Sequence, residues 1–366
     1  MTANTDRTAT ISADQHPLKL TPVARIPRLR VLAWDGDVLY ASRGYQLLRS
    51  RPDEAPLRWE PVASFAPARW RRLTALHRIS SRLVRDGFHA IAALPGGNLV
   101  AALPGAIATL THGEAEFRVT HRIARGTRPL NFGVAPNGHI YWGEYFDNQR
   151  RDEVHVYGST DGGLTWQVAH TFPAKSIRHI HNIIYDRDGI CFWVLTGDIA
   201  EECRILRVSA NWDQVETVLA GNQQVRAVAA VPAADGLYFA SDTPLEKNYI
   251  YHLDRSGEFH QRYEINSSVL CGCAVGKSVF FSTMVEPSAV NRDRQVALYG
   301  SRDPASLRTW SRLMSWRKDF WSLKYFQYGN AFLPTGNNTT NLLALTTIAV
   351  THADQVTSIF RLETDG

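Results

Sequence analysis

Cysteine is scarce in this sequence, and the number and spacing of the cysteines argue against a disulfide-rich fold and against a zinc site built on cysteine. The chain has 4 cysteines among 366 residues, too few for a disulfide scaffold. Cys271 and Cys273 are separated by one glycine, whereas Cys191 and Cys203 fall in neighbouring strand-like segments. Because no Cys-x-x-Cys pair occurs, a structural zinc site built on cysteine is not expected. We predict four reduced thiols.

Long hydrophobic runs are also missing. No window approaches ~18 consecutive apolar residues, so the sequence predicts neither a membrane-spanning helix nor a membrane partner. Residues 1–16 are polar and lack the apolar stretch of a secretory signal. We therefore expect a flexible segment over 1–16, a single domain over 17–366 and a cytoplasmic location. With 44% hydrophobic residues, that domain has enough apolar side chains for a large core.

Lysine is rare as well, and arginine takes its place. Lysine accounts for 6 of the 40 basic residues, and the remaining 34 are arginine. Because arginine binds carboxylates and phosphates through paired hydrogen bonds, a nucleic-acid partner has to be considered. The arginines are scattered singly through strand-like segments, without the clustered basic stretch of a nucleic-acid surface. We therefore predict no nucleic-acid partner.

Helical periodicity is nearly absent, and only residues 68–85 carry a pattern compatible with helix. Short alternating apolar runs bounded by Gly, Asp, Asn and Pro, typical of strands, extend through the chain. A unit of ~40–50 residues recurs, in which a strand, a polar turn with glycine and a second strand follow one another. The first strands of the seven units are expected at 29–34, 89–94, 131–135, 181–185, 227–232, 270–275 and 323–328.

Repeated units that cannot bury their own faces predict an all-β fold, the β-propeller. We expect seven four-stranded blades, or six if the first or last unit is incomplete. A strand near residues 18–23 is expected to join the last blade and close the ring.

One segment carries a family resemblance. Residues 159–166 read Ser-Thr-Asp-Gly-Gly-Leu-Thr-Trp, and a partial copy follows at 301–310. The segment resembles the Asp-box pattern S-x-D-x-G-x-T-W of the BNR-repeat β-propellers, which include sialidases and other carbohydrate-active enzymes. The resemblance implies a hairpin between the third and fourth strands of a blade, away from the site, so Asp161 is expected to stabilise the fold. Arg25-Ile26-Pro27 is similar to an early segment of sialidases, which implies that Arg25 binds a carboxylate.

Polar residues recur where each innermost strand is expected to begin. Alignment of the units on the glycine of their first turn gives a first ring made of Arg25, Asp86, Arg128, Arg178 and Arg226. A second ring, three residues later, consists of Arg28, His89, Asn131, His181 and Ala229. Arginines that converge from several blades form a cradle for a carboxylate, with His89 and Asn131 as further substrate contacts. The alternative is a channel lined by ion-paired, hydrated groups.

Long polar loops are expected on the same face, between the second and third strands of the blades. They lie at 144–149, 197–202, 242–246, 284–287 and 335–338. Glu144 and Asp198, in the first two, are the predicted acid and base of a hydrolase.

Residues 178–182, Arg-His-Ile-His-Asn, form the densest polar cluster. On a strand, His179 and His181 point to the same side, ~6.5–7 Å apart. That spacing suits an acid–base pair near neutral pH, or two ligands of one divalent metal ion with His89 or Glu144 as the third. We predict proton transfer or substrate contact rather than a metal site, so no cofactor is required.

These features together predict a carbohydrate-active enzyme with an arginine-lined central funnel, acting on an acidic oligosaccharide of the uronic or sialic type. The reaction is either glycoside hydrolysis at Glu144 and Asp198 or β-elimination, with His181 or His179 removing the proton. The alternative is a non-catalytic propeller that binds a glycan or a protein.

Overall fold

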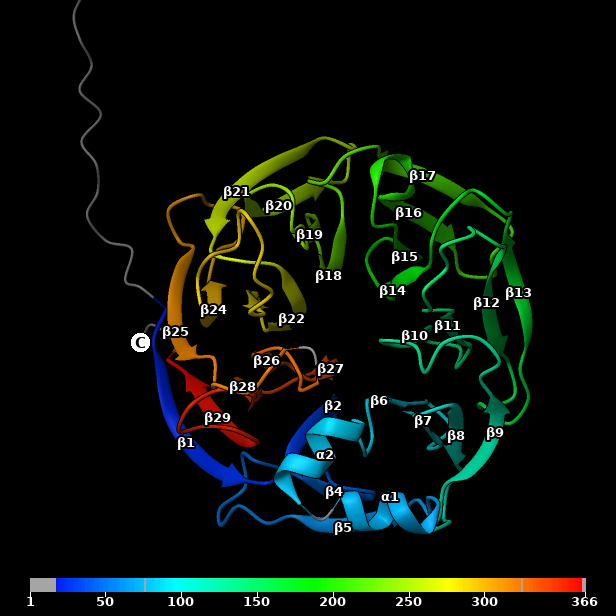
Figure 1. Ribbon diagram of the computed structural model, residues 1–366, viewed down its shortest axis with the longest axis vertical. Coiled ribbons are helices and arrows are strands. Elements are labelled where there is room, and N and C mark those ends of the chain that lie inside the picture. Colours follow the sequence, from blue (N-terminus) through cyan, green and yellow to red (C-terminus); the bar gives the residue numbers. More distant parts are fainter. Residues whose placement is uncertain (1–17, 76, 324, 364–366) are drawn as a thin grey trace, which may run out of the picture.

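The protein is a ring of seven sheets around a central axis (Figure 1). The computed structural model describes residues 18–75, 77–323 and 325–363, so the segment 1–16 expected to be flexible lies outside it. In the described chain, six sheets have four strands and one has five. The predicted propeller of seven four-stranded blades is confirmed, and blade 1 gains one extra strand.

Blades 1 to 3 each run from the innermost strand to the outermost one. Their strands are β2 (Arg30–Gly36), β3 (Val38–Arg43), β4 (Gln46–Ser50) and β5 (Glu60–Ser64) in blade 1; β6 (Ala90–Ala93), β7 (Leu99–Leu103), β8 (Ala106–Leu110) and β9 (Arg118–Arg122) in blade 2; and β10 (Gly133–Val134), β11 (Ile140–Gly143), β12 (Val154–Ser159) and β13 (Gln167–Phe172) in blade 3. Between blades 1 and 2 the chain forms α1 (Arg69–Thr74) and α2 (Arg78–Val84), within the helical segment expected at 68–85.

Blades 4 to 6 repeat this order. Their strands are β14 (Ile180–Asp186), β15 (Cys191–Thr196), β16 (Arg204–Ser209) and β17 (Val215–Ala220) in blade 4; β18 (Ala227–Ala233), β19 (Gly236–Ser241), β20 (Asn248–Asp254) and β21 (Phe259–Ile265) in blade 5; and β22 (Val269–Val275), β23 (Ser278–Thr283), β24 (Gln295–Ser301) and β25 (Ser311–Arg317) in blade 6. A short 3-10 helix, η1 (Ala200–Glu202), precedes β16.

Blade 7 closes the ring with both ends of the chain. It consists of β26 (Asn330–Phe332), β28 (Leu342–Ile348), β29 (Val356–Leu362) and, outermost, β1 (Leu20–Pro27), which pairs antiparallel with β29. The predicted closure by an N-terminal strand is confirmed. The first strand expected at 323–328 is wrong, because the innermost strand is β26. The next segment, β27 (Thr335–Asn338), pairs in parallel with β2 of blade 1 near the axis (Figure 1).

The core lies between neighbouring blades. Second strands such as β7, β15 and β23 are buried along their whole length, since both of their faces contact an adjacent blade. Outermost strands such as β13 are largely exposed. A large apolar side chain buried in this way contributes roughly 1.5–3 kcal/mol. Each blade is therefore stabilised by its neighbours, and the ring has to close.

The innermost strands begin at one face of the ring, which we call the top face. Four of them carry a β-bulge close to that face, at Leu32, His181, Val228 and Leu270. A bulge adds one residue to a strand and turns the neighbouring side chains. It therefore changes which side chains at the top of a blade point into the channel.

The segment at 159–166 forms the turn between β12 and β13, the third and fourth strands of blade 3. The Asp161 carboxylate accepts hydrogen bonds from the Ser159 hydroxyl at 2.7 Å and from the backbone N–H groups of Leu164 and Thr165 at 3.0 Å. Burial alone would raise the pKa of Asp161, but these bonds and that of the Thr165 hydroxyl lower it to about 2. Gly163 has φ +83°, and a Cβ there would lie 2.5 Å from Val100. Asp161 therefore stabilises a turn, as predicted.

Candidate functional site

A cavity of about 1000 Å³ occupies the central channel. Its wall includes every residue of β2 from Arg30 to Asp35, so the cavity extends from the top face along the length of the innermost strands. Loops after the second strands of blades 3, 5 and 6 contribute Tyr145, Asp242 and Glu286. The volume lies at the upper end of the range for small-molecule sites, ~300–1000 Å³.

Three arginines, Arg30, Arg85 and Arg128, line the top of this cavity. Arg30 is the first residue of β2, and Arg128 lies in the loop between β9 and β10. Arg85 follows α2 in a left-handed conformation, with φ 53°. Among the described residues, no carboxylate forms an ion pair with any of the three. We call these residues the arginine cluster.

The guanidinium groups of the arginine cluster carry like charges and are largely removed from water. Burial, followed by repulsion from Arg30 and Arg85, lowers the pKa of Arg128 to about 10. Burial also lowers the pKa of Arg30 to about 10, and its buried Nε has no hydrogen-bond partner in the described chain. An anion in the cavity would relieve this repulsion and complete these hydrogen bonds.

His89 lies beside the arginine cluster. Burial, with repulsion from Arg128 and Arg30, holds the pKa of this imidazole well below its usual range, so the ring is neutral. Its Nε2 lies 2.8 Å from the carbonyl oxygen of Arg85, which accepts a hydrogen bond only if Nε2 carries the proton. Nδ1 therefore keeps its lone pair and is able to accept a proton.

Two carboxyl groups line the cavity from blades 5 and 6. Asp242 directly follows β19, and Glu286 lies in the loop after β23. Burial raises the pKa of Asp242 to about 7, with Arg226 opposing this and Glu286 adding to it, and burial also raises the pKa of Glu286. Both groups lie within hydrogen-bonding reach of the Ser268 hydroxyl. Asp242 is therefore able to exchange a proton near neutral pH.

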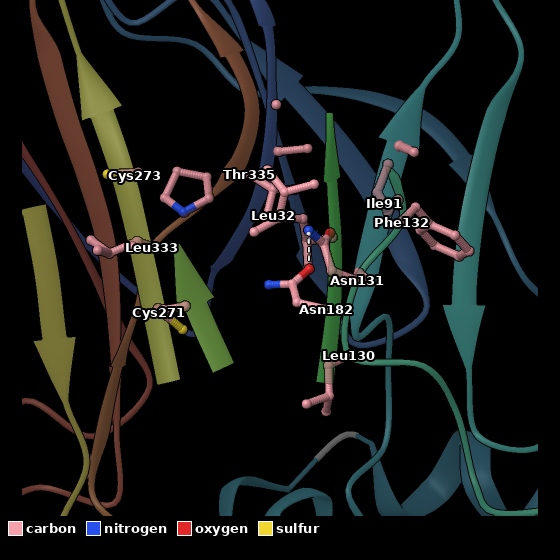
Figure 2. Close-up of a pocket in the computed structure, with 18 of the residues that line it drawn as sticks. Leu32, Ile91, Leu130, Asn131, Phe132, Asn182, Cys271, Cys273, Leu333 and Thr335 are labelled. Carbon is pink, nitrogen blue, oxygen red and sulfur yellow. Dashed lines mark hydrogen bonds between the residues drawn. The ribbon is translucent and has the colours of Figure 1, made fainter. Parts of the chain in front are cut away.

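Neutral polar side chains also line the channel. Asn131 donates a hydrogen bond to Asn182 at 3.2 Å (Figure 2). Asn182 in turn donates to the carbonyl oxygen of Val228 at 2.9 Å. Figure 2 shows Cys271 and Leu333 on the facing wall. Burial raises the pKa of Cys271 to about 11, so its thiol stays protonated.

His179, His181 and Asp198 form a second polar cluster, which does not line the cavity. The two Nε2 atoms are 3.0 Å apart, and the His181 side chain is 2% exposed. Burial, followed by repulsion from His181, lowers the pKa of His179 to about 4. Burial alone would raise the pKa of Asp198, but His181, His179 and Arg226 lower it. Tyr145, 4.4 Å from the His179 ring between centroids, and Arg226 contact this cluster and line the channel.

The structure brings several predicted site residues to the channel. Arg128, Arg226, His89 and Asn131 line it. Arg178 does not: it forms ion pairs with Asp198, at 2.9 Å, and with Asp147. The predicted pairing of His179 with His181 is present.

Four further residues are not where they were expected. Arg25 is not at the channel mouth, because its strand β1 is the outermost of blade 7, where Arg25 donates to the carbonyl oxygen of His352 at 2.7 Å. Glu144 lies away from the channel and accepts hydrogen bonds from Arg125 and from the His155 N–H. His181 and His179 are buried behind the channel wall, so the substrate contact predicted for them is not made from these positions.

The metal alternative also has a different third ligand. His89 belongs to the arginine cluster and Glu144 is held by Arg125, so neither joins His179 and His181. Asp198 does.

Sequence reasoning missed four cavity residues: Arg30, Arg85, Asp242 and Glu286. Asp242 and Glu286 lie in two of the long polar loops expected from the sequence, at 242–246 and 284–287, but neither residue was assigned a role there. Arg30 is two residues beyond Arg28 of the second ring, and Arg85 is placed by the turn that follows α2, which no repeat specifies.

No family model matches the chain, and no curated protein sequence matches it. Solved structures do. A chain of the mitotic checkpoint complex aligns at TM-score 0.57 and 10% identity, covering 98% of this chain and 100% of that one. The WD40 β-propeller domain of Doa1 aligns at TM-score 0.57 and 12% identity, over 95% and 98% of the two chains. A chain of the nidogen/laminin complex aligns at TM-score 0.50 and 10% identity, over 82% and 97%. At these identities the likeness shows the β-propeller fold.

Within the described residues, no helix is long and apolar enough to cross a membrane.

Proposed function

We propose that the channel binds an acidic sugar, whose carboxylate sits on Arg30, Arg85 and Arg128, and that the protein cleaves this sugar by β-elimination. The observation that supports this is the arginine cluster, which has no carboxylate partner in the described chain and surrounds a neutral histidine. Guanidinium groups bind both oxygens of a carboxylate. A bound uronate therefore offsets the repulsion among the three arginines.

The chemistry follows from what the arginines do to a bound uronate. Neutralising the carboxylate acidifies the C–H next to it, and stabilises the negative charge that develops when the proton leaves. Nδ1 of His89 accepts this proton. The electron pair forms the C=C bond, the bond to the leaving oxygen breaks, and that oxygen takes a proton from an acid such as Asp242. We assign proton removal to His89, because His181 does not reach the cavity.

A second reaction, glycoside hydrolysis, is favoured by the Asp242–Glu286 pair. Hydrolases use two carboxyl groups, one protonated and one ionised. Burial, with a smaller contribution from Glu286, raises the pKa of Asp242 to about 7, so Asp242 is able to supply the protonated group of such a pair. In this case the arginines fix the acidic sugar, and Asp242 protonates the leaving oxygen.

The test is a turnover screen on matched pairs of acidic and neutral oligosaccharides, which scores new reducing ends and unsaturated uronates separately. Elimination predicts unsaturated products from uronate chains, with His89→Gln lowering turnover by roughly 100-fold or more. Arg122→Gln is the matched control, since Arg122 is an exposed arginine at the end of β9.

The outcomes separate the two reactions. Reducing ends without unsaturation, lost in Asp242→Asn, would replace elimination with hydrolysis. Binding of acidic chains without turnover would leave a glycan-binding propeller. If the protein bound and cleaved acidic and neutral oligosaccharides equally well, the proposal would fail.

A further inference from the structure

His179, His181 and Asp198 bring two imidazoles and a carboxylate together inside the protein. His179 precedes β14, His181 is the bulged residue of β14, and Asp198 lies in the loop after β15. The two Nε2 atoms are 3.0 Å apart. Asp198 Oδ2 lies 3.6 Å from His179 Nε2, and Asp198 Oδ1 lies 3.4 Å from His181 Nε2. The exposed fractions of the three side chains are 7%, 2% and 11%.

The hydrogen bonds of the other ring nitrogens decide where the imidazole protons are. Nδ1 of His179 lies 2.9 Å from the carbonyl oxygen of Phe146, and Nδ1 of His181 lies 2.9 Å from that of Ala227. A carbonyl oxygen only accepts, so both Nδ1 atoms are donors. In the neutral rings, both Nε2 lone pairs consequently face each other and the Asp198 carboxylate. Two lone pairs and a negative charge at this distance need a cation between them.

We infer that His179, His181 and Asp198 bind one divalent metal ion of the zinc type. In a tetrahedral zinc site the ligand atoms lie 2.0–2.2 Å from the metal, which puts neighbouring ligands ~3.3 Å apart. The two Nε2 atoms are 3.0 Å apart, and each has one oxygen of the Asp198 carboxylate, a different one in each case, at 3.6 or 3.4 Å, so all three separations are close to this value. Imidazole nitrogen and carboxylate oxygen are both ligands that zinc accepts.

The second layer of contacts resembles that of a built metal site. Ligand histidines characteristically donate their other N–H to a backbone carbonyl, which fixes the ring and the tautomer. Here the carbonyls come from the loop after β11 in blade 3 and from the start of β18 in blade 5, on either side of blade 4. An ion at this place would therefore connect three consecutive blades at the top face.

The charges around the cluster are compatible with a cation. Arg178 and Arg226 form ion pairs with Asp198, at 2.9 and 3.1 Å. Each arginine also pairs with a second carboxylate, Arg178 with Asp147 and Arg226 with Asp242 at 3.6 Å. Once Asp242 has lost its proton, three carboxylates are present for two guanidinium groups. The arginines orient the Asp198 carboxylate rather than replace the ion.

The experiment is a metal analysis of the purified full chain after loading with zinc and gel filtration, together with a cobalt spectrum. The comparison is among the wild type, His179→Gln, His181→Gln and a control, His260→Gln. His260 is exposed and forms a surface cluster with the exposed Glu258 and the half-buried Asp254, so the control measures adventitious surface binding. Circular dichroism checks that each variant is folded.

The proposal predicts about one zinc per chain in the wild type and in His260→Gln. It also predicts cobalt absorption bands of a tetrahedral site with nitrogen ligands, and a Tm that falls on chelation. His179→Gln and His181→Gln should bind zinc at least ~100-fold more weakly. Equal zinc in the wild type and the folded His181→Gln variant would overturn the proposal. A wild type that takes up no metal and keeps its Tm in chelator would also overturn it, and would mean that a proton holds the cluster together.

Discussion

Replacing Arg128 with glutamine should stabilise the protein while removing its affinity for acidic ligands. Burial and repulsion from Arg30 and Arg85 lower the pKa of Arg128 from 12.5 to about 10. The charged form, which is present at neutral pH, is therefore less favourable in the folded state than in the unfolded one. At ~1.4 kcal/mol per pKa unit the cost has an upper bound of about 3.5 kcal/mol, and solvent screening reduces it to roughly 1–2 kcal/mol. Glutamine removes the charge and keeps most of the side-chain volume.

The assay for Arg128→Gln is thermal unfolding with and without a hexuronate oligosaccharide. For a chain of this length, 1 kcal/mol corresponds to roughly 1–2 °C in Tm, so the variant should unfold roughly 1–4 °C above the wild type. The oligosaccharide should raise the Tm of the wild type but not of the variant, because loss of a charge-assisted bond of ~1.5–3 kcal/mol weakens binding by roughly 10- to 150-fold. Arg122→Gln should match the wild type in both respects. A variant that is less stable than Arg122→Gln, or that binds as the wild type does, would refute this reasoning.

Three further predictions concern stability. Because burial raises the pKa of Asp242 to about 7, ionisation of this carboxyl group lowers the free energy of unfolding increasingly from about pH 4 to pH 7. Asp242→Asn should therefore have a free energy of unfolding up to about 4 kcal/mol above that of the wild type at pH 8, and nearly the same at pH 4. Urea unfolding at both pH values measures this difference. Asp161→Ala removes four hydrogen bonds from an exposed turn and should cost about 1–2 kcal/mol, whereas Asp303→Ala in the partial copy of the segment should cost less than about 0.5 kcal/mol; equal effects in chemical denaturation would contradict the role given to Asp161. The Arg82 side chain is 2% exposed and forms ion pairs with Asp319 at 2.6 Å and Asp354 at 3.2 Å. Arg82→Met leaves both carboxylates without this partner and should lower the free energy of unfolding by about 3 kcal/mol. An unchanged midpoint of urea unfolding would show that these ion pairs contribute little.

The fold could be predicted because its repeat is a physical necessity. Each blade buries both faces of its middle strands against its neighbours, so the pattern of strand, turn and buried strand recurs along the chain. Six innermost strands lie where the repeat placed them. The seventh does not, because residues 323–328 precede β26 and the segment after it pairs with β2 of blade 1. A contact between the two ends of the ring has no local sequence signal.

The candidate site could be predicted only in part. Register alone placed Arg128, His89 and Asn131 at the channel, because each precedes an innermost strand. It did not show that His181 turns away from the channel, since the bulge at this residue interrupts the alternation of side chains. Nor did it place Arg25, whose strand belongs to blade 7. Arg85 depends on a left-handed residue at the end of an inserted helix, which lies outside the repeat.

The arginine cluster is the central claim, and a crystal structure with a bound acidic disaccharide tests it most directly. The account predicts density for the sugar carboxylate within hydrogen-bonding distance of the guanidinium groups of Arg30, Arg85 and Arg128, with the sugar ring against His89. The same soak with Arg128→Gln crystals should show the sugar weakly or not at all. A carboxylate bound elsewhere in the wild type, or the same pose in Arg128→Gln at equal occupancy, would contradict the account.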